Sequence, residues 1–342
     1  MTNSCTAESS CSTVSLIEGG DFIPGNNFIA RDDKLSNLGI NALIDGDVDL
    51  GDGNNSLVNS GVLGSVGSFA VAAGSGNDTI SGGGEVDTAS YEYAPSAVTV
   101  NLALGTASGG DGNDTLIAIE NLTGGAGDDV LTGAAGGNQI AGGGGDDVIS
   151  GLAGDDSLDG GAGIDEAGYA GAASFVYVDL GSGAADFGAG HDTLVAFENI
   201  LGSSWDDQLI GSAGVNAIAG GGGADTLLGL GGADVLTGAA GGDIFMFNAV
   251  LDADNDFATL EEITDFTTGQ DVIDLAHIDP DTGTAGDQAF VFIGSAAFTT
   301  SAEAQVRFAD GILYCDTDRD VGSEMEIALT GVTSLTAADL IL

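Results

Sequence analysis

Aspartate residues recur at one fixed place in a nine-residue pattern, and their carboxylates are the groups of this chain best suited to holding a metal ion. The stretch GGGGDDVIS, residues 142–150, shows the pattern: glycines, then an aspartate at the sixth place and an apolar residue at the eighth. Five such nonapeptides follow one another from residue 124, and five more from residue 202. The residues at the sixth place are Asp78, Asp87, Asp114, Asp129, Asn138, Asp147, Asp156, Asp165, Asp192, Asp207, Asn216, Asp225, Asp234 and Asp243.

The fixed spacing predicts that these side chains stack in columns and bind Ca²⁺. Two nonapeptides make one full coil, so sixth-place residues 18 residues apart are expected to lie one above the other. Glycine turns expose carbonyl oxygens between such carboxylates, and this set of oxygens suits Ca²⁺. Mg²⁺ gives up its water reluctantly, and Zn²⁺ favours His or Cys. Ordinary solvated acidic turns would not require an aspartate at one fixed place. Asn138 and Asn216 carry no charge, which predicts weaker sites.

The apolar residue at the eighth place predicts a short strand. One inward apolar side chain between two outward neighbours is typical of a three-residue strand, and the six residues before it form the turn. Stacked coils of this kind form a parallel β-roll, which is an all-β solenoid. A longer repeat lies over the short one, because residues 82–159 are duplicated as residues 160–237. Equivalent residues such as Asp87 and Asp165 are 78 places apart.

The charge balance also indicates bound cations. The chain has 53 acidic residues but only four Lys and Arg residues, for a net charge of −49. Repulsion at this charge opposes a compact state, and it excludes nucleic acid as a partner. Each coil buries about two aliphatic side chains, which contribute about 5 kcal/mol. Ordering the residues of one coil costs several times more. We therefore expect folding to depend on Ca²⁺.

The nonapeptides of residues 73–246 resemble the RTX (repeats-in-toxin) family, whose repeat reads GGxGxDxUx with a large apolar residue at U. The resemblance implies a parallel β-roll that binds several Ca²⁺ ions. The chain departs from this repeat at two of its places, the fourth and the eighth. Glu85 and Trp205 replace the glycine at the fourth place, which predicts malformed or empty turns. Ala89 and Ala167 replace the larger apolar residue, so we expect the roll to change shape there.

The chain outside the repeats is expected to form two further regions. Residues 247–342 resemble the C-terminal region of serralysin-type proteins, and their ending DLIL, residues 339–342, resembles the uncleaved signal of type I secretion. This resemblance implies a C-terminal β cap and makes the type I secretion machinery a partner. Residues 1–72 are expected to form an irregular β-solenoid or cap. Within them, Cys5 and Cys11 are close enough either to form a small disulfide loop or to remain two thiols.

The N-terminal sequence and the apolar runs bear on localisation. The first twenty residues lack the basic and apolar regions of a cleavable signal peptide. No apolar run approaches the ~18 residues that a membrane span needs. Together with the C-terminal resemblance, this predicts a secreted protein, extracellular or on the cell surface.

The motif content favours a protein that is not an enzyme. His191 and His277 are the only histidines, which excludes the HExxH motif of zinc proteases, and no GxSxG elbow occurs. We predict a secreted, non-enzymatic Ca²⁺-binding structural protein: a surface-layer, matrix or adhesive scaffold that assembles with Ca²⁺ or contacts a cell surface or polysaccharide. The alternative is an accessory RTX module or variant of a secreted polymer-modifying enzyme, related to an epimerase, lyase or protease. Self-association would separate the two, since an enzyme module is expected to stay monomeric.

Overall fold

The computed structural model describes residues 69–84, 86–248, 260–279, 288–300, 303–317 and 322–342, and the backbone of six short strands before residue 60. The chain divides into two compact units. Unit 1 comprises Met1–Ala167 and Gly190–Phe197, and unit 2 comprises Gly168–Ala189 and Glu198–Leu342. The predicted bridge between Cys5 and Cys11 and the predicted departure at Glu85 lie outside the described residues.

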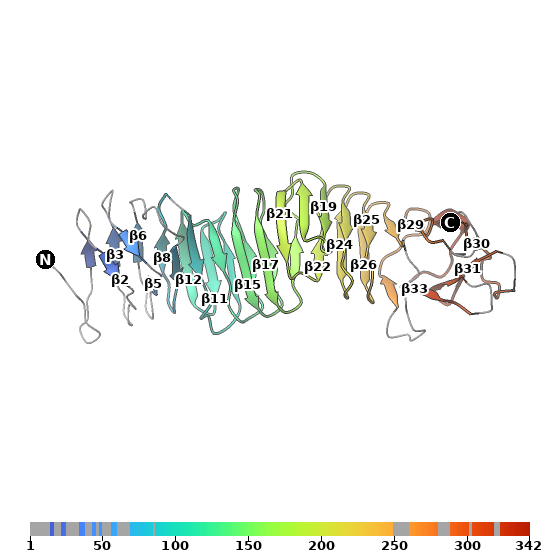
Figure 1. Ribbon diagram of the computed structural model, residues 1–342, viewed down its shortest axis with the longest axis horizontal. Coiled ribbons are helices and arrows are strands. Elements are labelled where there is room, and N and C mark those ends of the chain that lie inside the picture. Colours follow the sequence, from blue (N-terminus) through green and yellow to red (C-terminus); the bar gives the residue numbers. More distant parts are fainter. Residues whose placement is uncertain are drawn as a thin grey trace. The chain divides into compact units, whose positions relative to one another are not determined.

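Each nonapeptide forms one short strand, as the apolar eighth place predicts. Strand β14 (Val130–Thr132) pairs in parallel with β16 (Val148–Ser150), and Val130 is opposite Val148, one coil later. The alternate nonapeptides form a second parallel series, in which β15 (Gln139–Gly144) pairs with β17 (Ser157–Ala162). Figure 1 shows such neighbouring coils side by side, as for β15 and β17. The inward side chains are fully or almost fully buried: Leu131, Ile140, Ile149 and Leu158.

The fold is thus an all-β parallel β-roll, as predicted. The other strands of unit 1 are β1 (Val14–Leu16), β2 (Phe22–Pro24), β3 (Lys34–Asn37), β4 (Leu43–Asp45), β5 (Val48–Asp49), β6 (Ser56–Asn59), β7 (Phe69–Ala72), β8 (Thr79–Ser81), β9 (Asp87–Ser90), β10 (Val98–Asn101), β11 (Thr106–Gly109), β12 (Gly112–Ile117), β13 (Asn121–Thr123), β21 (Gly190–Val195) and β18 (Glu166–Gly168) at the boundary. Parallel pairing also joins β1 to β3, β3 to β6 and β6 to β8.

Unit 2 repeats the same arrangement and ends in a cap. Its strands are β19 (Val176–Asp179), β20 (Ala184–Phe187), β22 (Asn199–Leu201), β23 (Gln208–Ile210), β24 (Ala217–Gly222), β25 (Thr226–Leu228), β26 (Val235–Ala240), β27 (Ile244–Met246), β28 (Glu261–Ile263), β29 (Val272–Asp274), β30 (Val291–Phe292), β31 (Gln305–Ala309), β32 (Ile312–Asp316), β33 (Met325–Leu329) and β34 (Leu340–Ile341). A short 3₁₀ helix, Ala337–Asp339, precedes β34.

The cap closes unit 2 with antiparallel strands. β31, β32 and β33 pair antiparallel in that order, and β33 pairs in parallel with β28, which continues the series of β24 and β26. The last strand, β34, pairs with β29. The predicted C-terminal β cap is therefore present. The domain boundaries at residues 72/73 and 246/247 stay predictions.

Both copies of the 78-residue duplication carry an inserted antiparallel hairpin. In the first copy β10 pairs with β11, and in the second copy β19 pairs with β20. The hairpins follow the small inward residues Ala89 and Ala167, where a change in the roll was predicted. Even unusual backbone angles are repeated, since Leu152 and Leu230 both have φ of 74°.

The described residues contain no helix that is long and apolar enough to span a membrane. They also contain one thiol, that of Cys315, which is fully buried in β32. Burial raises the pKa of this thiol, so it is protonated at neutral pH.

Candidate calcium-binding turns

All fourteen predicted ligand residues are buried. Each of these Asp and Asn side chains is at most 4% exposed. By contrast, Asp146, which precedes Asp147, is exposed. A buried carboxylate is costly unless hydrogen bonds or a cation compensate its lost hydration. The partners of these carboxylates therefore decide what the turns can bind.

One carboxylate oxygen of several sixth-place aspartates binds the backbone of the neighbouring coil. The N–H of Asp129 donates to Oδ1 of Asp147 at 2.7 Å, and the N–H of Asp147 donates to Oδ1 of Asp165 at 2.8 Å. In unit 2 the N–H of Asp207 donates to Oδ1 of Asp225 at 2.8 Å. These bonds join residues 18 places apart, so the side chains stack in columns as the repeat spacing predicts.

The second carboxylate oxygen has no partner at four of these residues. Oδ2 is buried without a hydrogen bond in Asp147, Asp156, Asp225 and Asp234. Burial is the main cause that raises the pKa of Asp147 and of Asp234 to about 6. Burial, with nearby carboxylates, raises that of Asp225 to about 7. A buried acceptor with no donor is a position where a cation would restore the lost interactions.

Glycine carbonyl oxygens converge on the same positions. A Cβ atom on Gly142 would overlap Oδ2 of Asp147 and would lie 2.5 Å from the carbonyl oxygen of Gly160, in the next coil. Only glycine permits this approach. Further along the turn, Gly143 and Gly145 have φ of +107° and +102°, which other residues rarely adopt. The glycine-rich turn therefore brings carbonyl oxygens to an unpartnered carboxylate oxygen.

This set of oxygens fits Ca²⁺. Calcium takes six to eight oxygen ligands, including carboxylates and backbone carbonyls. In the described part of the chain, no three His, Cys, Asp or Glu side chains gather in one place. An ion in such a turn would therefore take most of its protein ligands from backbone carbonyls.

The side-chain amides of the two asparagines form hydrogen bonds within the protein. Nδ2 of Asn138 donates to the carbonyl oxygen of Glu120 at 2.5 Å, and Oδ1 accepts from the N–H of Ala134. Nδ2 of Asn216 donates in the same way to the carbonyl oxygen of Glu198 at 2.6 Å. The weaker sites expected there stay a prediction.

The turn that contains Trp205 keeps the hydrogen bonds of a regular turn. Asp129 accepts the N–H groups of Val98 and Gly125 at 2.8 and 2.6 Å. Asp207, in the Trp205 turn, accepts those of Val176 and Ser203 at 2.7 and 2.6 Å. The tryptophan thus leaves this part of the turn unchanged, and whether the turn holds an ion stays a prediction.

Two acidic residues after the repeats extend the columns and were missed in the sequence. Oε2 of Glu261 accepts the N–H of Asp234 at 3.2 Å, and Oε1 is buried without a partner. Burial and Asp234 raise the pKa of Glu261 to about 8. Oδ1 of Asp271 accepts the N–H of Asp243 at 3.0 Å. Asp271 follows Gly269 and precedes Ile273 with the spacing of a nonapeptide, which was the available signal.

Comparison with known families gives the class of protein. The RTX calcium-binding nonapeptide repeat (4 copies) matches residues 71–89, 106–118, 119–149 and 132–167. The C-terminal region of the peptidase M10 serralysins matches residues 190–342. The resemblance to RTX proteins is confirmed: the chain is an RTX protein whose repeats bind several Ca²⁺ ions, and it carries a serralysin-type C-terminal region. These two regions indicate a protein that is secreted by the type I route and is extracellular.

One solved structure that is similar is the crystal structure of the extracellular lipase LipA from Serratia marcescens. Its sequence identity to this chain is 18% and the TM-score is 0.19, with 65% of this chain covered. The chain spans 40% of the length of that lipase chain. No curated protein matches the chain.

The buried carboxylates predict how the Ca²⁺-free protein responds to pH. The pKa of an Asp or Glu in the unfolded chain is about 4, whereas the pKa in the folded chain reaches about 7 for Asp225 and about 8 for Glu261. The folded chain therefore binds more protons than the unfolded chain in this range. This contribution to stability is complete below about pH 4 and is lost as the pH rises through about 6 to 8.

We therefore expect the Ca²⁺-free protein to gain β structure as the pH falls from about 8 to about 5. Far-UV circular dichroism in metal-free buffers measures this directly. The Ca²⁺ affinity should fall over the same pH decrease, so the midpoint of the titration moves to higher Ca²⁺ concentration, because protons compete with Ca²⁺ for the same oxygens. A metal-free spectrum that is the same throughout this range would contradict the prediction.

Proposed function

We propose that the chain is a non-enzymatic structural protein that folds when Ca²⁺ binds to its repeat turns outside the cell. The observation that carries this proposal is the set of buried carboxylate oxygens without a partner, at Asp147, Asp156, Asp225 and Asp234. They occur in both units, and each of the four lies at the sixth place of its nonapeptide. Ion sites that repeat along the roll in this way would stabilise the fold, whereas an enzyme needs one site where a reaction takes place.

Calcium then acts as a switch for folding. One ion at ten times its dissociation constant contributes about 1.4 kcal/mol. Four ions would contribute about 6 kcal/mol, which is within the total stability of an ordinary domain. A chain of this kind stays unfolded where Ca²⁺ is scarce, as export requires, and folds where Ca²⁺ is abundant.

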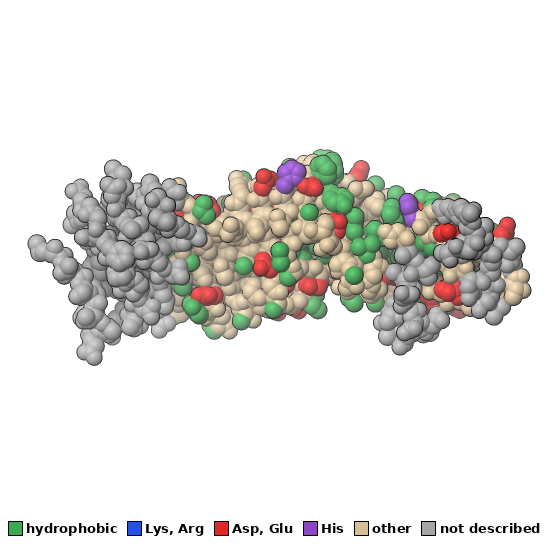
Figure 2. Space-filling model, in the orientation of Figure 1, with side chains coloured by type: hydrophobic (Ala, Val, Ile, Leu, Met, Phe, Trp, Pro, Cys, Tyr) green, Lys and Arg blue, Asp and Glu red, His purple; other side chains and the backbone are tan. Residues whose placement is uncertain are grey.

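The acidic surface favours a scaffold whose contacts with other molecules are made through Ca²⁺ or through uncharged groups. On the face shown in Figure 2, acidic and hydrophobic side chains of the described residues are scattered, and no Lys or Arg is visible among them. Two copies with a net charge of −49 repel each other. We propose assembly into a surface-layer, matrix or adhesive structure, with additional Ca²⁺ between copies or with contact to a polysaccharide.

Light scattering during a Ca²⁺ titration tests this role. A scaffold should scatter more strongly as Ca²⁺ rises beyond the end of the folding transition measured by circular dichroism. A strictly monomeric folded protein would contradict self-assembly. That result would favour the second candidate, an accessory module of a secreted polymer-modifying enzyme, which the match to the serralysin C-terminal region supports.

A further inference from the structure

Three aromatic side chains of unit 2 are exposed. Phe175 is 45% exposed, Phe187 58% and Trp205 50%. The rings of Phe175 and Phe187 lie 4.8 Å apart between centroids, tilted by 35°. Phe187 ends strand β20 opposite Val176, so both phenylalanines belong to the base of the inserted hairpin. We call these three residues the aromatic platform.

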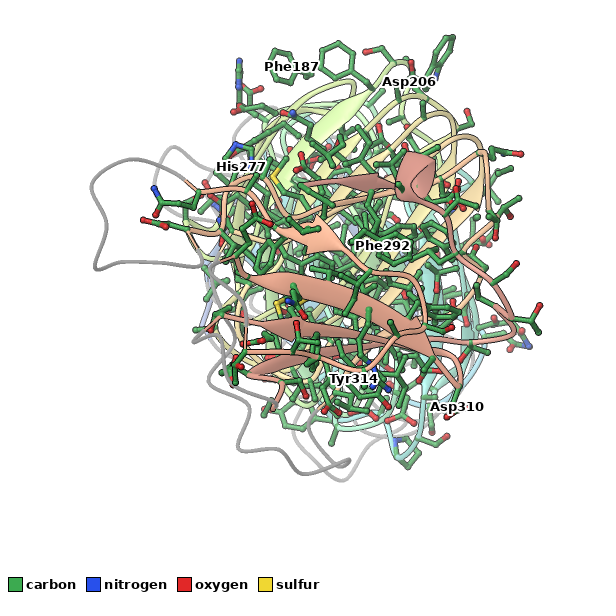
Figure 3. All side chains as sticks on the ribbon, turned by 90° about the vertical axis from the view of Figure 1, so that its right-hand side faces the viewer. Phe187, Asp206, His277, Phe292, Asp310 and Tyr314 are labelled. Atoms are coloured by element: carbon green, nitrogen blue, oxygen red, sulfur yellow. The ribbon has the colours of Figure 1, made fainter. Side chains whose placement is uncertain are left out.

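The turn that contains Trp205 lies beside the segment of Phe175. The N–H of Val176 donates to Oδ1 of Asp207, which places the segment of Phe175 directly beside the turn of Trp205. The first copy of the duplication shows the same neighbourhood: a Cβ on Gly127 would lie 2.5 Å from the backbone nitrogen of Ala97, and these are the counterparts of Trp205 and Phe175. Figure 3 shows Phe187 and Asp206, the neighbour of Trp205, at the same outer edge.

The roll does not need these aromatic residues for its own folding. Their counterparts 78 places earlier are Ala97, Gly109 and Gly127, and that copy forms the same hairpin and the same hydrogen bonds to its aspartate. Phe187 has φ of 82°, in the left-handed region, where Gly109 has φ of 134°. A bulky side chain in this region is strained. Strain retained at an exposed position indicates a role in binding.

The net charge of the chain limits which class of ligand the aromatic platform can bind. A net charge of −49 repels an anionic polymer and a second copy of the chain. A cationic partner would be attracted by carboxylates on any face and would not need aromatic rings. An uncharged sugar ring presents C–H groups, which pack on the electron-rich face of an aromatic ring. Its hydroxyl groups can donate to an exposed carboxylate such as that of Asp206, beside Trp205.

We propose that the aromatic platform binds a neutral polysaccharide. The inference rests on the proposed function only in that the ligand lies outside the cell. The contact uses three surface rings along one edge of unit 2. It would attach the Ca²⁺-folded roll to an uncharged glycan.

The only tryptophan of the chain belongs to the platform, so its fluorescence reports on this surface alone. The full-length protein, in saturating Ca²⁺, is titrated with hydroxyethylcellulose, dextran and soluble starch. We expect at least one of these uncharged polymers to shift the emission to shorter wavelength in a saturable way. Polylysine serves as the cationic probe.

Matched variants exchange residues between the two copies of the duplication. The test variant combines Phe175→Ala and Phe187→Gly, which installs the residues of the first copy and retains Trp205. The control variant combines Tyr93→Gly and Leu104→Ser, which installs residues of the second copy at positions 74% and 75% exposed. We expect the test variant to bind the glycan at least tenfold more weakly and the control variant to bind like the natural sequence. Circular dichroism checks that both variants fold with Ca²⁺.

Three results would overturn the proposal. None of the three polymers shifts the emission, or the folded test variant binds as tightly as the natural sequence, or polylysine alone shifts the emission. The last result would identify a cationic partner instead. Failure of the Ca²⁺ proposal is seen separately: a protein that is folded in chelator and binds glycan would contradict the folding switch and leave the platform in place.

Discussion

Removal of Ca²⁺ by a chelator is expected to abolish most of the β structure of the protein at neutral pH. Without the ion, the carboxylates of Asp147, Asp156, Asp225 and Asp234 each keep a buried oxygen with no partner. Each such oxygen costs about 1–3 kcal/mol, and more when it is charged. Four of them together cost about 4–12 kcal/mol, which is comparable to the whole stability of an ordinary domain, about 5–15 kcal/mol.

Far-UV circular dichroism of the chelated protein, followed by a Ca²⁺ titration, measures this effect. The β signal should return cooperatively, since each coil pairs with the next and an ion in one turn orders its neighbour. Mg²⁺ is the control and should not restore the signal, because it demands octahedral geometry and keeps its water. A β spectrum that is already complete in chelator at neutral pH would contradict the expectation.

Replacement of Gly142 by alanine is expected to destabilise the Ca²⁺-loaded protein by about 2–3 kcal/mol. A Cβ at this position would overlap Oδ2 of Asp147 and approach its Cγ to 2.9 Å. It would also lie 2.5 Å from the carbonyl oxygen of Gly160. The alanine therefore displaces two of the oxygens that we propose as calcium ligands, so both the thermal midpoint and the Ca²⁺ affinity should fall.

Gly144→Ala is the matched control in the same turn. A Cβ at this position meets only the carbonyl oxygen of Ala162, at 3.8 Å. Its partner in the next coil is that alanine, so the roll accepts a methyl group at this register position. We expect a change of less than about 0.5 kcal/mol. If the two variants had equal midpoints and equal Ca²⁺ affinities, Gly142 would not belong to a binding turn.

The sequence predicts the roll and its columns because both follow from short-range periodicity. The sixth and eighth places fix the direction of each side chain, so Asp147 stacks in its column and Ile149 is buried, as expected. The family assignment follows from the same nonapeptides. The hairpins were not predicted, because antiparallel pairing such as that of β10 and β11 depends on turns outside the nine-residue pattern.

Other features depend on contacts between distant residues. Glu261 joins a column although it lies 27 residues after Asp234 rather than 18, and its longer side chain takes the place of an aspartate, so no spacing rule identifies it. Trp205 breaks the glycine pattern, yet the bonds around Asp207 are those of a regular turn, since Ser203 supplies the N–H that Gly125 supplies in the first copy. The closeness of Phe175 and Phe187 to the turn of Trp205 could not be predicted from the sequence, because it depends on where the hairpin packs in the fold.

The most direct measurement is the number of Ca²⁺ ions held by one folded chain, from native mass spectrometry of the full-length protein. We predict at least four ions, one for each of Asp147, Asp156, Asp225 and Asp234, whose Oδ2 is buried without a partner. The double variant Asp147→Asn, Asp225→Asn should lose at least two ions relative to the natural sequence. A folded chain with no bound Ca²⁺, or a double variant with an unchanged ion count, would contradict the assignment of these turns as calcium sites.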